Sequence, residues 1–170
     1  MSERERPLSL RPILFPESAA VVGASTTPGK LGHTILSNML DAGFRGPIHP
    51  IHPREHEILS RPAYPSLSEA PGPVDLVVVA IPGSGVVPVI EEAAEMGAGG
   101  AVVISAGFAE AGAEGAEAER RLRAISREAG LPIIGPNCQG VSAGEAASPP
   151  GSARPRTTGE TACSFPRAVD

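Results

Sequence analysis

The stretch "AAVVGASTTPGKLG", Ala19 to Gly32, decides the fold of this chain. It begins with small and β-branched apolar residues, passes through a turn of glycine, serine, threonine and proline, and reaches Lys30 before a helical pattern. Such a transition is typical of a buried strand that turns directly into a helix. The free N–H groups and the dipole at a helix start favour an anion, so the turn is a candidate phosphate site.

Apolar runs resembling 19–22 recur along the chain and predict further strands. They lack the polar alternation of a half-exposed strand, which favours a parallel sheet covered on both faces. The expected strands are 19–24, 74–82, 100–106, the shorter 131–136, and a proline-rich strand within 46–53.

Helical patterns lie between these strands, over 32–43, 85–97 and 115–130. Each ends at a glycine that suits the position after a helix, namely Gly43, Gly97 and Gly130. Right-handed crossovers between parallel strands then predict an α/β fold, an open, doubly wound and Rossmann-like sheet of about five mostly parallel strands with helices on both faces.

The bulk properties of the chain exclude several classes of function. A net charge of −5 argues against nucleic-acid partners. The longest apolar run, 74–82, is too short to cross a bilayer, and the N-terminus lacks the apolar part of a secretory signal. Because the chain has only two cysteines, Cys138 and Cys163, we expect no disulfide framework and a cytoplasmic protein.

A chain of 170 residues is long enough for one domain with its own core, which we place at 1–142. The remainder, 143–170, contains several prolines and almost no large apolar side chains. Such a segment cannot bury enough surface to offset its ordering entropy, so we expect a disordered or loosely attached tail.

The glycine-rich turn fits neither of two familiar phosphate-binding motifs. The dinucleotide pattern G-x-G-x-x-G fails because the glycine after Gly23 is Gly29. The P-loop pattern nearly fits at Gly29-Lys30, but Gly23 lies one residue too far upstream and Leu31 replaces the magnesium-binding hydroxyl. A tight strand–helix connection with a solvated lysine therefore remains the alternative to a phosphate site.

The end of the expected second strand carries cations where an NAD-binding fold has an acid. His49, His52 and Arg54 precede the first acid, Glu55. A cation there suits a phosphate on a ribose, as in NADP or in the 3′-phosphate of coenzyme A. Either histidine alone is expected to be a surface or edge residue, and Arg54 is the stronger candidate.

From about Leu8 to Val141 the chain resembles the CoA-binding domain of the NDP-forming acyl-CoA synthetases, relatives of the succinyl-CoA synthetase α subunit. Five segments in the family's order carry the resemblance: "AAVVGASTTPGKLG", "GFRGPIHPIHPR", "PVDLVVVAIPGSGVVPVIEEAAEMG", "VVISAGFAEAGAEG" and "IIGPNCQGV". The resemblance implies a Rossmann-like fold that binds coenzyme A or an acyl-CoA.

The resemblance also implies the binding residues, which fall at the carboxyl ends of strands, where open sheets bind ligands. They are implied to hold the phosphates (Gly23, Ala24, Ser25, Lys30), to lie beside the adenosine (Ile51, His52, Pro53, Arg54), to line the pantetheine path (Ile81, Pro82, Gly83) and to border the thiol (Ser105, Ala106, Gly107, Asn137, Cys138).

Three of these positions have a second interpretation. The family more often has Asn-Pro-Lys where this chain has His52-Pro53-Arg54, which keeps the charge but changes its geometry. Asn137 can equally stabilise a turn. Cys138 has no identifiable partner base, so a small buried filler is the simpler role. Glu110 is expected in a solvated loop, and no catalytic or metal-binding residue is assigned.

The resembling ligases react through a phosphorylated histidine on a second α/β domain, which an ATP-grasp domain charges. All four histidines of this chain lie within 33–56, on segments that do not match that role. We therefore expect a CoA-binding module without its own catalysis. The alternatives are a subunit or truncated fragment of an ADP- or GDP-forming acyl-CoA ligase, completed by a partner chain, and an NAD(P)-binding oxidoreductase or redox sensor, which only the fold supports.

Overall fold

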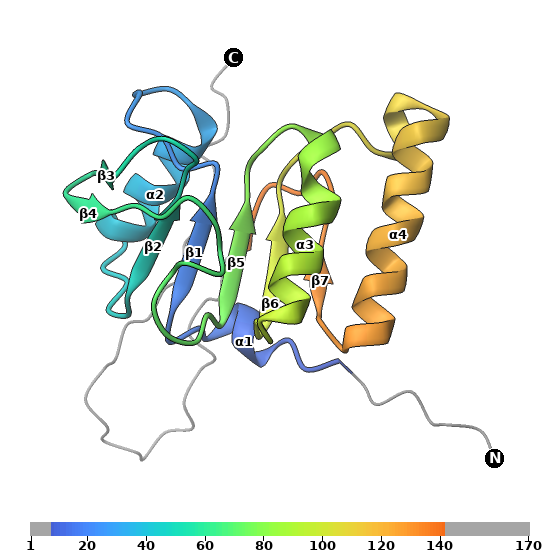
Figure 1. The fold of residues 1–170 in the computed structure, drawn as a ribbon, viewed down its shortest axis with the longest axis horizontal. Helices are drawn as coiled ribbons and strands as arrows, with labels where there is room; N and C mark the ends of the chain where they lie inside the picture. The colour runs from blue at the N-terminus through green and yellow to red at the C-terminus, as the bar shows by residue number, and fades with distance from the viewer. Residues whose placement is uncertain (1–7, 142–170) are drawn as a thin grey trace, which may run out of the picture.

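The centre of the molecule is a five-stranded parallel sheet in the order β2-β1-β5-β6-β7 (Figure 1). The computed structural model describes residues 8–141, so the expected tail at 143–170 lies outside the described residues. The strands are β1 (Ala19–Val22), β2 (Ile48–Ile51), β5 (Leu76–Val79), β6 (Gly100–Val103) and β7 (Ile133–Ile134).

Burial along the strands agrees with their apolar sequences. Every residue of β1, β2, β5 and β6 is buried, whereas both residues of the edge strand β7 are half-buried. Strand β1 pairs with β2 on one side and with β5 on the other, so the order of strands reverses between β1 and β5. Ligands of doubly wound sheets bind at such a reversal.

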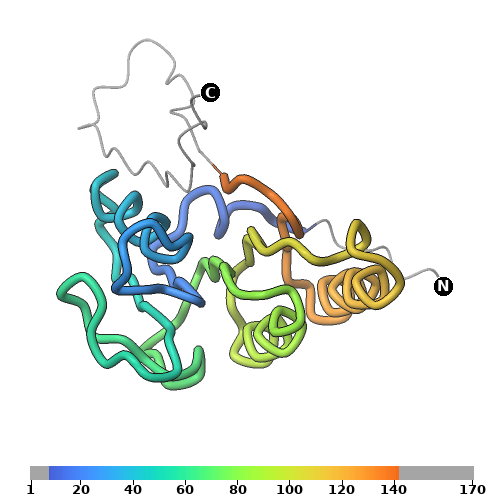
Figure 2. The backbone as a smooth tube through the Cα atoms, turned by 90° about the horizontal axis from the view of Figure 1, so that it is seen from above, coloured from blue at the N-terminus to red at the C-terminus, as the bar shows by residue number. Residues whose placement is uncertain are grey.

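Helices cover both faces of the sheet (Figure 2). Seen from above, α2 and the segment 135–141 lie on one face, and α3 and α4 lie on the other. The helices are α1 (Arg11–Leu14), α2 (Leu31–Asp41), α3 (Val86–Glu95) and α4 (Ala113–Ala129), with single 3₁₀ turns η1 (Gly83–Gly85) and η2 (Ala109–Ala111). The doubly wound fold predicted from the sequence is confirmed.

Two hydrophobic clusters, one per face, form the core. On the α2 face, Ile35, Leu36 and Met39 pack with Val21 and other strand residues. On the opposite face, α3 and α4 contribute apolar residues at helical spacing, namely Val86, Ile90, Ala93, Leu122 and Ile125. Alternate residues of the same strand serve the two clusters, as a sheet buried on both sides requires.

Between β2 and β5 the chain forms a hairpin that the sequence did not predict. Strand β3 (Glu57–Ile58) pairs antiparallel with β4 (Arg61–Pro62). After the hairpin, the Tyr64 N–H donates to the Pro50 carbonyl at 3.0 Å, and the His52 N–H donates to the Tyr64 carbonyl at 2.9 Å. This segment therefore covers the outer edge of β2, while β7 forms the opposite edge.

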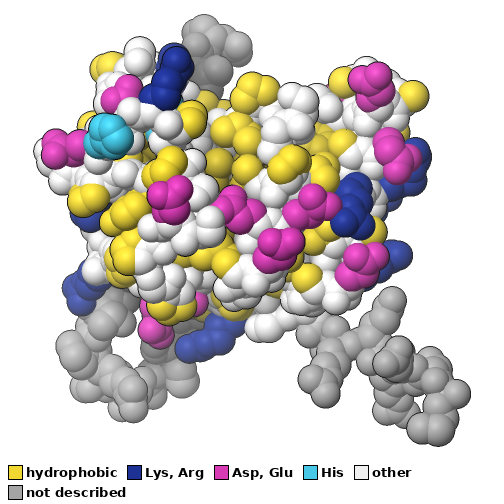
Figure 3. Space-filling model, in the orientation of Figure 1, with side chains coloured by type: hydrophobic (Ala, Val, Ile, Leu, Met, Phe, Trp, Pro, Cys, Tyr) yellow, Lys and Arg dark blue, Asp and Glu magenta, His cyan; other side chains and the backbone are white. Residues whose placement is uncertain are grey.

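Acidic side chains are scattered across the α3–α4 face among hydrophobic and basic ones (Figure 3). Helix α3 alone carries Glu91, Glu92 and Glu95. No helix among residues 8–141 is long and apolar enough to cross a bilayer.

Candidate functional site

The loops that follow the five parallel strands meet at the carboxyl edge of the sheet, uppermost in Figure 1. They contain the site residues expected from the sequence except Ile51, which is the last residue of β2. The order of strands reverses at the same edge, between β1 and β5.

The loop after β1 lies against its neighbours with no space for side chains at two glycines. Gly23 has φ of +87°, and a methyl group on it would lie 2.4 Å from the Ala80 carbonyl oxygen at the end of β5. A methyl group on Gly32, in the first turn of α2, would lie 1.8 Å from the Gly23 carbonyl oxygen. Gly32 therefore allows close helix–strand packing, the role of the third glycine in the dinucleotide fingerprint, although the spacing differs.

Hydrogen bonds between residues close in sequence stabilise the loop after β1, the candidate phosphate site. The Ser25 hydroxyl oxygen accepts from the Thr27 N–H at 3.1 Å, and His33 Nδ1 donates to the Ser25 carbonyl at 3.0 Å. Lys30 occupies the N-cap position of α2 with no side-chain cap on the helix, and its exposed ammonium has no acidic partner within 8–141. The loop thus presents one free cation beside a helix start.

The imidazole of His52 stabilises the turn in the loop after β2. Its Nδ1 accepts from the backbone N–H groups of Arg54, at 3.3 Å, and Glu55, at 3.1 Å. The exposed Arg54 guanidinium has no ion-pair partner in the described part of the chain. The Gly23 N–H donates to the Ile51 carbonyl at 3.1 Å, which joins this loop to the one after β1.

The ends of β5 and β6 are fastened together by Ser105. Its buried hydroxyl accepts from the Ile81 N–H at 3.2 Å and donates to the Val79 carbonyl at 3.4 Å. A methyl group on Gly83 would lie 2.7 Å from the Ala106 carbonyl oxygen. Ser105 therefore holds the loops in place, and its hydroxyl hydrogen is already used within the protein.

Farther along the same loop, the exposed carboxylate of Glu110 accepts from the Gly107 N–H at 2.8 Å. This bond is the main reason that the pKa of the carboxyl group is lowered. The backbone N–H groups of Glu110 itself and of Phe108 lower it further. The expectation of a solvated position is confirmed, but the carboxylate also closes the turn after β6. The sequence held no signal for this contact.

The loop after β7 contacts the loop after β6 through its backbone. Asn137 has φ of +54°, and its N–H donates to the Ser105 carbonyl at 3.0 Å. Cys138 is half-buried, and its thiol donates to the Val103 carbonyl at 3.3 Å and packs against the α2-face cluster. These contacts agree with the structural roles considered for the two residues, a turn residue for Asn137 and a small filler for Cys138.

His49 lies in the edge strand β2, one of the two positions expected for it, but it is not on the surface. It is 7% exposed in β2, its ring lies edge-on to Tyr64 with 5.7 Å between centroids, and burial lowers its pKa. The segment after the hairpin covers it through Tyr64, and no sequence pattern predicted that contact. Among the described residues, no cluster of three or more histidine, cysteine or acidic side chains could hold a metal ion.

A family model described as "CoA binding domain" matches residues 17–144. The chain belongs to this CoA-binding domain family. The resemblance seen in the sequence is thereby confirmed, and coenzyme A is the cofactor of the domain.

Relatives of this CoA-binding domain include ADP-forming acyl-CoA ligases. Acetate–CoA ligase [ADP-forming] II of Archaeoglobus fulgidus is 44% identical over 78% of this chain and 20% of its own length. The α subunit of acetate–CoA ligase [ADP-forming] II of Pyrococcus furiosus is 40% identical over 74% of this chain and 27% of its own. The chain therefore spans less than a third of these relatives.

Solved structures share the fold. The dinucleotide-forming acetyl-coenzyme A synthetase 1 of Ca. Korarchaeum cryptofilum, in complex with phosphate and ADP, superimposes with a TM-score of 0.74 and 38% identity, covering 79% of this chain and 29% of that one. A conserved hypothetical protein of Pyrococcus furiosus matches with a TM-score of 0.55 and 30% identity, covering 69% of this chain and 91% of that one. The same fold thus occurs within a long synthetase and in a short chain.

Proposed function

We propose that coenzyme A or an acyl-CoA lies across the carboxyl edge of the sheet, with its phosphates on the loop after β1 and its 3′-phosphate at Arg54. The observation that supports this placement is a pair of exposed cations, Lys30 and Arg54, which have no acidic partners among residues 8–141 and lie on the loops after the neighbouring strands β1 and β2. An anion is favoured there although the whole chain is acidic.

The backbone supports the same orientation. The start of α2 has no side-chain cap, so its free N–H groups and positive dipole end are available to a phosphate. Gly23 and Gly83 let the loops after β1, β5 and β6 pack closely together. At Gly107 the nearest atom to an added methyl group would be 3.9 Å away, so this loop surface is open to a thin pantetheine chain. In this placement the thiol lies toward the loop that carries Asn137.

We further propose that this domain supplies CoA to an acyl-CoA ligase whose other domains belong to another polypeptide. Three of the four imidazoles in the described residues have local structural roles: His33 binds the Ser25 carbonyl, His52 closes its own turn, and His49 is buried. The fourth, His56, is exposed in the loop before β3. Two Pyrococcus furiosus relatives are called α subunits, which supports a divided enzyme as the working state.

Calorimetric titration with CoA and with dephospho-CoA tests the placement. CoA should bind about tenfold more tightly, since a guanidinium–phosphate contact is a charge-assisted hydrogen bond. Arg54→Ala should remove this preference, whereas Arg45→Ala, an exposed arginine in the loop before β2, should preserve it.

Two results would count against the proposal. Equal affinity for both ligands in the wild-type protein would move the 3′-phosphate away from Arg54. No heat and no thermal shift at about 1 mM CoA would remove the binding site altogether, because a ligand of the native state must stabilise it.

A further inference from the structure

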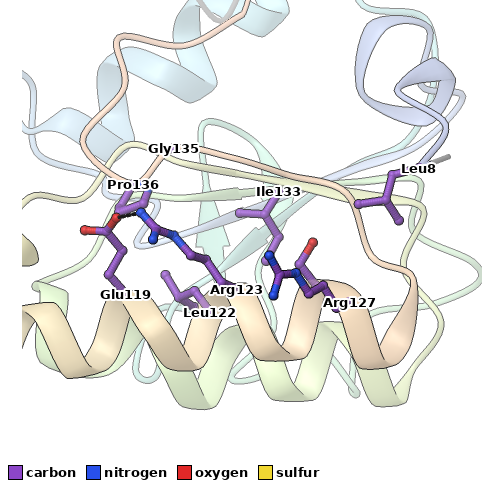
Figure 4. A pocket seen from close by; sticks show the side chains of 9 residues that line it. Leu8, Glu119, Leu122, Arg123, Arg127, Ile133, Gly135 and Pro136 are labelled. Atoms are coloured by element: carbon purple, nitrogen blue, oxygen red, sulfur yellow. Dashed lines mark hydrogen bonds and ion pairs between the residues drawn. The ribbon is translucent and has the colours of Figure 1, made fainter. Parts of the chain in front are cut away.

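A cavity of about 230 Å³ lies between α4 and the edge strand β7. Only Gly135 and Pro136 connect it to the loops of the CoA site. Figure 4 shows side chains converging on it from α4, from β7 and from the segment before α1. The wall is apolar and the rim is charged, with Leu8, Leu122, Ile133 and Pro136 in the wall and Glu119, Arg123 and Arg127 at the rim.

The charges at the rim are not balanced. Helix α4 carries four arginines, and within the described structure each of them except Arg127 pairs with a glutamate. Arg123 turns toward Glu119, and Arg127 reaches from α4 toward Ile133 (Figure 4). The remaining polar group, the Ser126 hydroxyl, donates its hydrogen to the Leu131 carbonyl at 2.7 Å. A ligand therefore meets one unpaired guanidinium beside an apolar surface.

We propose that this cavity binds a small monocarboxylic acid with an apolar body. Arg127 holds the carboxylate in a bidentate contact, and the body lies against Leu122 and Ile133. The volume is below the roughly 300–1,000 Å³ of sites for drug-sized molecules, so the body is limited to one ring or a short branched chain. This second site does not depend on CoA being bound.

Fluorine NMR with 4-fluorobenzoate tests the proposal, with the uncharged 4-fluorobenzamide as the matched ligand. The benzoate should bind with a dissociation constant of about 1 mM, as suits so few atoms. Its affinity should fall about tenfold in Arg127→Gln, and the amide should bind about tenfold more weakly to the wild-type protein. Arg45→Gln, at the far side of the sheet, should bind like the wild type.

A second variant keeps the test independent of charge. Leu8→Ser removes an exposed part of the apolar wall and should weaken both ligands without altering their ratio. Backbone amide shifts of the wild-type protein should change within residues 122–136, and the variants should melt at the wild-type temperature.

Three results would overturn the proposal: equal binding of benzoate and benzamide, unchanged benzoate affinity in Arg127→Gln, or no saturation up to about 20 mM. A separate CoA titration distinguishes the two sites. Loss of CoA binding with benzoate binding retained would affect only the proposed function, and the opposite result would affect only this cavity.

Discussion

Single atoms determine how closely the loops of the carboxyl edge approach one another, and the two glycines that bound η1 allow a matched test. A methyl group on Gly83 meets the backbone oxygen of Ala106 at 2.7 Å, whereas one on Gly85 meets the mobile end of Ile81 at 3.1 Å. Gly83→Ala should destabilise the protein by about 1–3 kcal/mol and weaken CoA binding, because the two loops must separate. Gly85→Ala should cost less than about 1 kcal/mol. Urea unfolding and calorimetry measure both effects, and equal behaviour of the two variants would contradict the steric argument.

Ser105 offers a second test at this scale. Ser105→Ala leaves the Ile81 N–H without its 3.2 Å acceptor and should cost about 1–3 kcal/mol in urea unfolding. CoA affinity should fall with it, since Ile81 begins the proposed pantetheine path. Ser84→Ala, at an exposed serine of η1, is the control and should change neither quantity. Full CoA affinity in Ser105→Ala would show that the loop keeps its position without the hydroxyl.

Among the elements, the β3–β4 hairpin is the one with a strained turn. Leu59 and Ser60 have φ of +50° and +59°, which non-glycine residues adopt at a cost. Ser60→Gly should therefore stabilise the protein by about 0.5–1 kcal/mol. Leu59→Gly should not, because that side chain packs against the α2-face cluster. Thermal unfolding compares the two, and a lower melting temperature for Ser60→Gly would refute the strain.

How far the elements follow from the sequence depends on their length and burial. Continuous apolar runs predicted all five strands of the sheet, but 80–82 and 104–106 belong to loops, since apolar sequence reports burial rather than backbone pairing. Glycines with positive φ after α2, α3 and α4 are confirmed at Gly43, Gly97 and Gly130. Helix α1 has four residues, too few for a period, and the Leu59–Ser60 turn lacks the asparagine or glycine that announces a hairpin.

The candidate site was predictable to the level of its loops, not of its contacts. Gly23, Lys30 and Arg54 follow from strand ends and from the family resemblance. The clamp formed by Ser105 and the carboxylate contact of Glu110 depend on how loops distant in sequence face one another. Only the folded chain defines that arrangement.

For the molecule as a whole, His49 links stability to pH. Burial lowers the pKa of its imidazole, so the unfolded chain binds a proton more readily than the native protein. Stability should be full above about pH 6.5 and decline as the pH falls below it, toward the lowered native pKa. His49→Phe should flatten this decline in urea unfolding measured at several pH values. Glu110 titrates in a more acidic range, so its contribution is separable.

The segment that carries Arg54 is joined to β2 on both sides, at His52 and at Tyr64, by main-chain bonds of 2.9 and 3.0 Å. Because this segment is anchored at both ends, an insertion should change the shape of its middle and not the position of its ends. Extra residues inserted between Leu59 and Ser60 would therefore lengthen the tip while the guanidinium kept its place. That tip is therefore a place where a label can be attached without displacing Arg54.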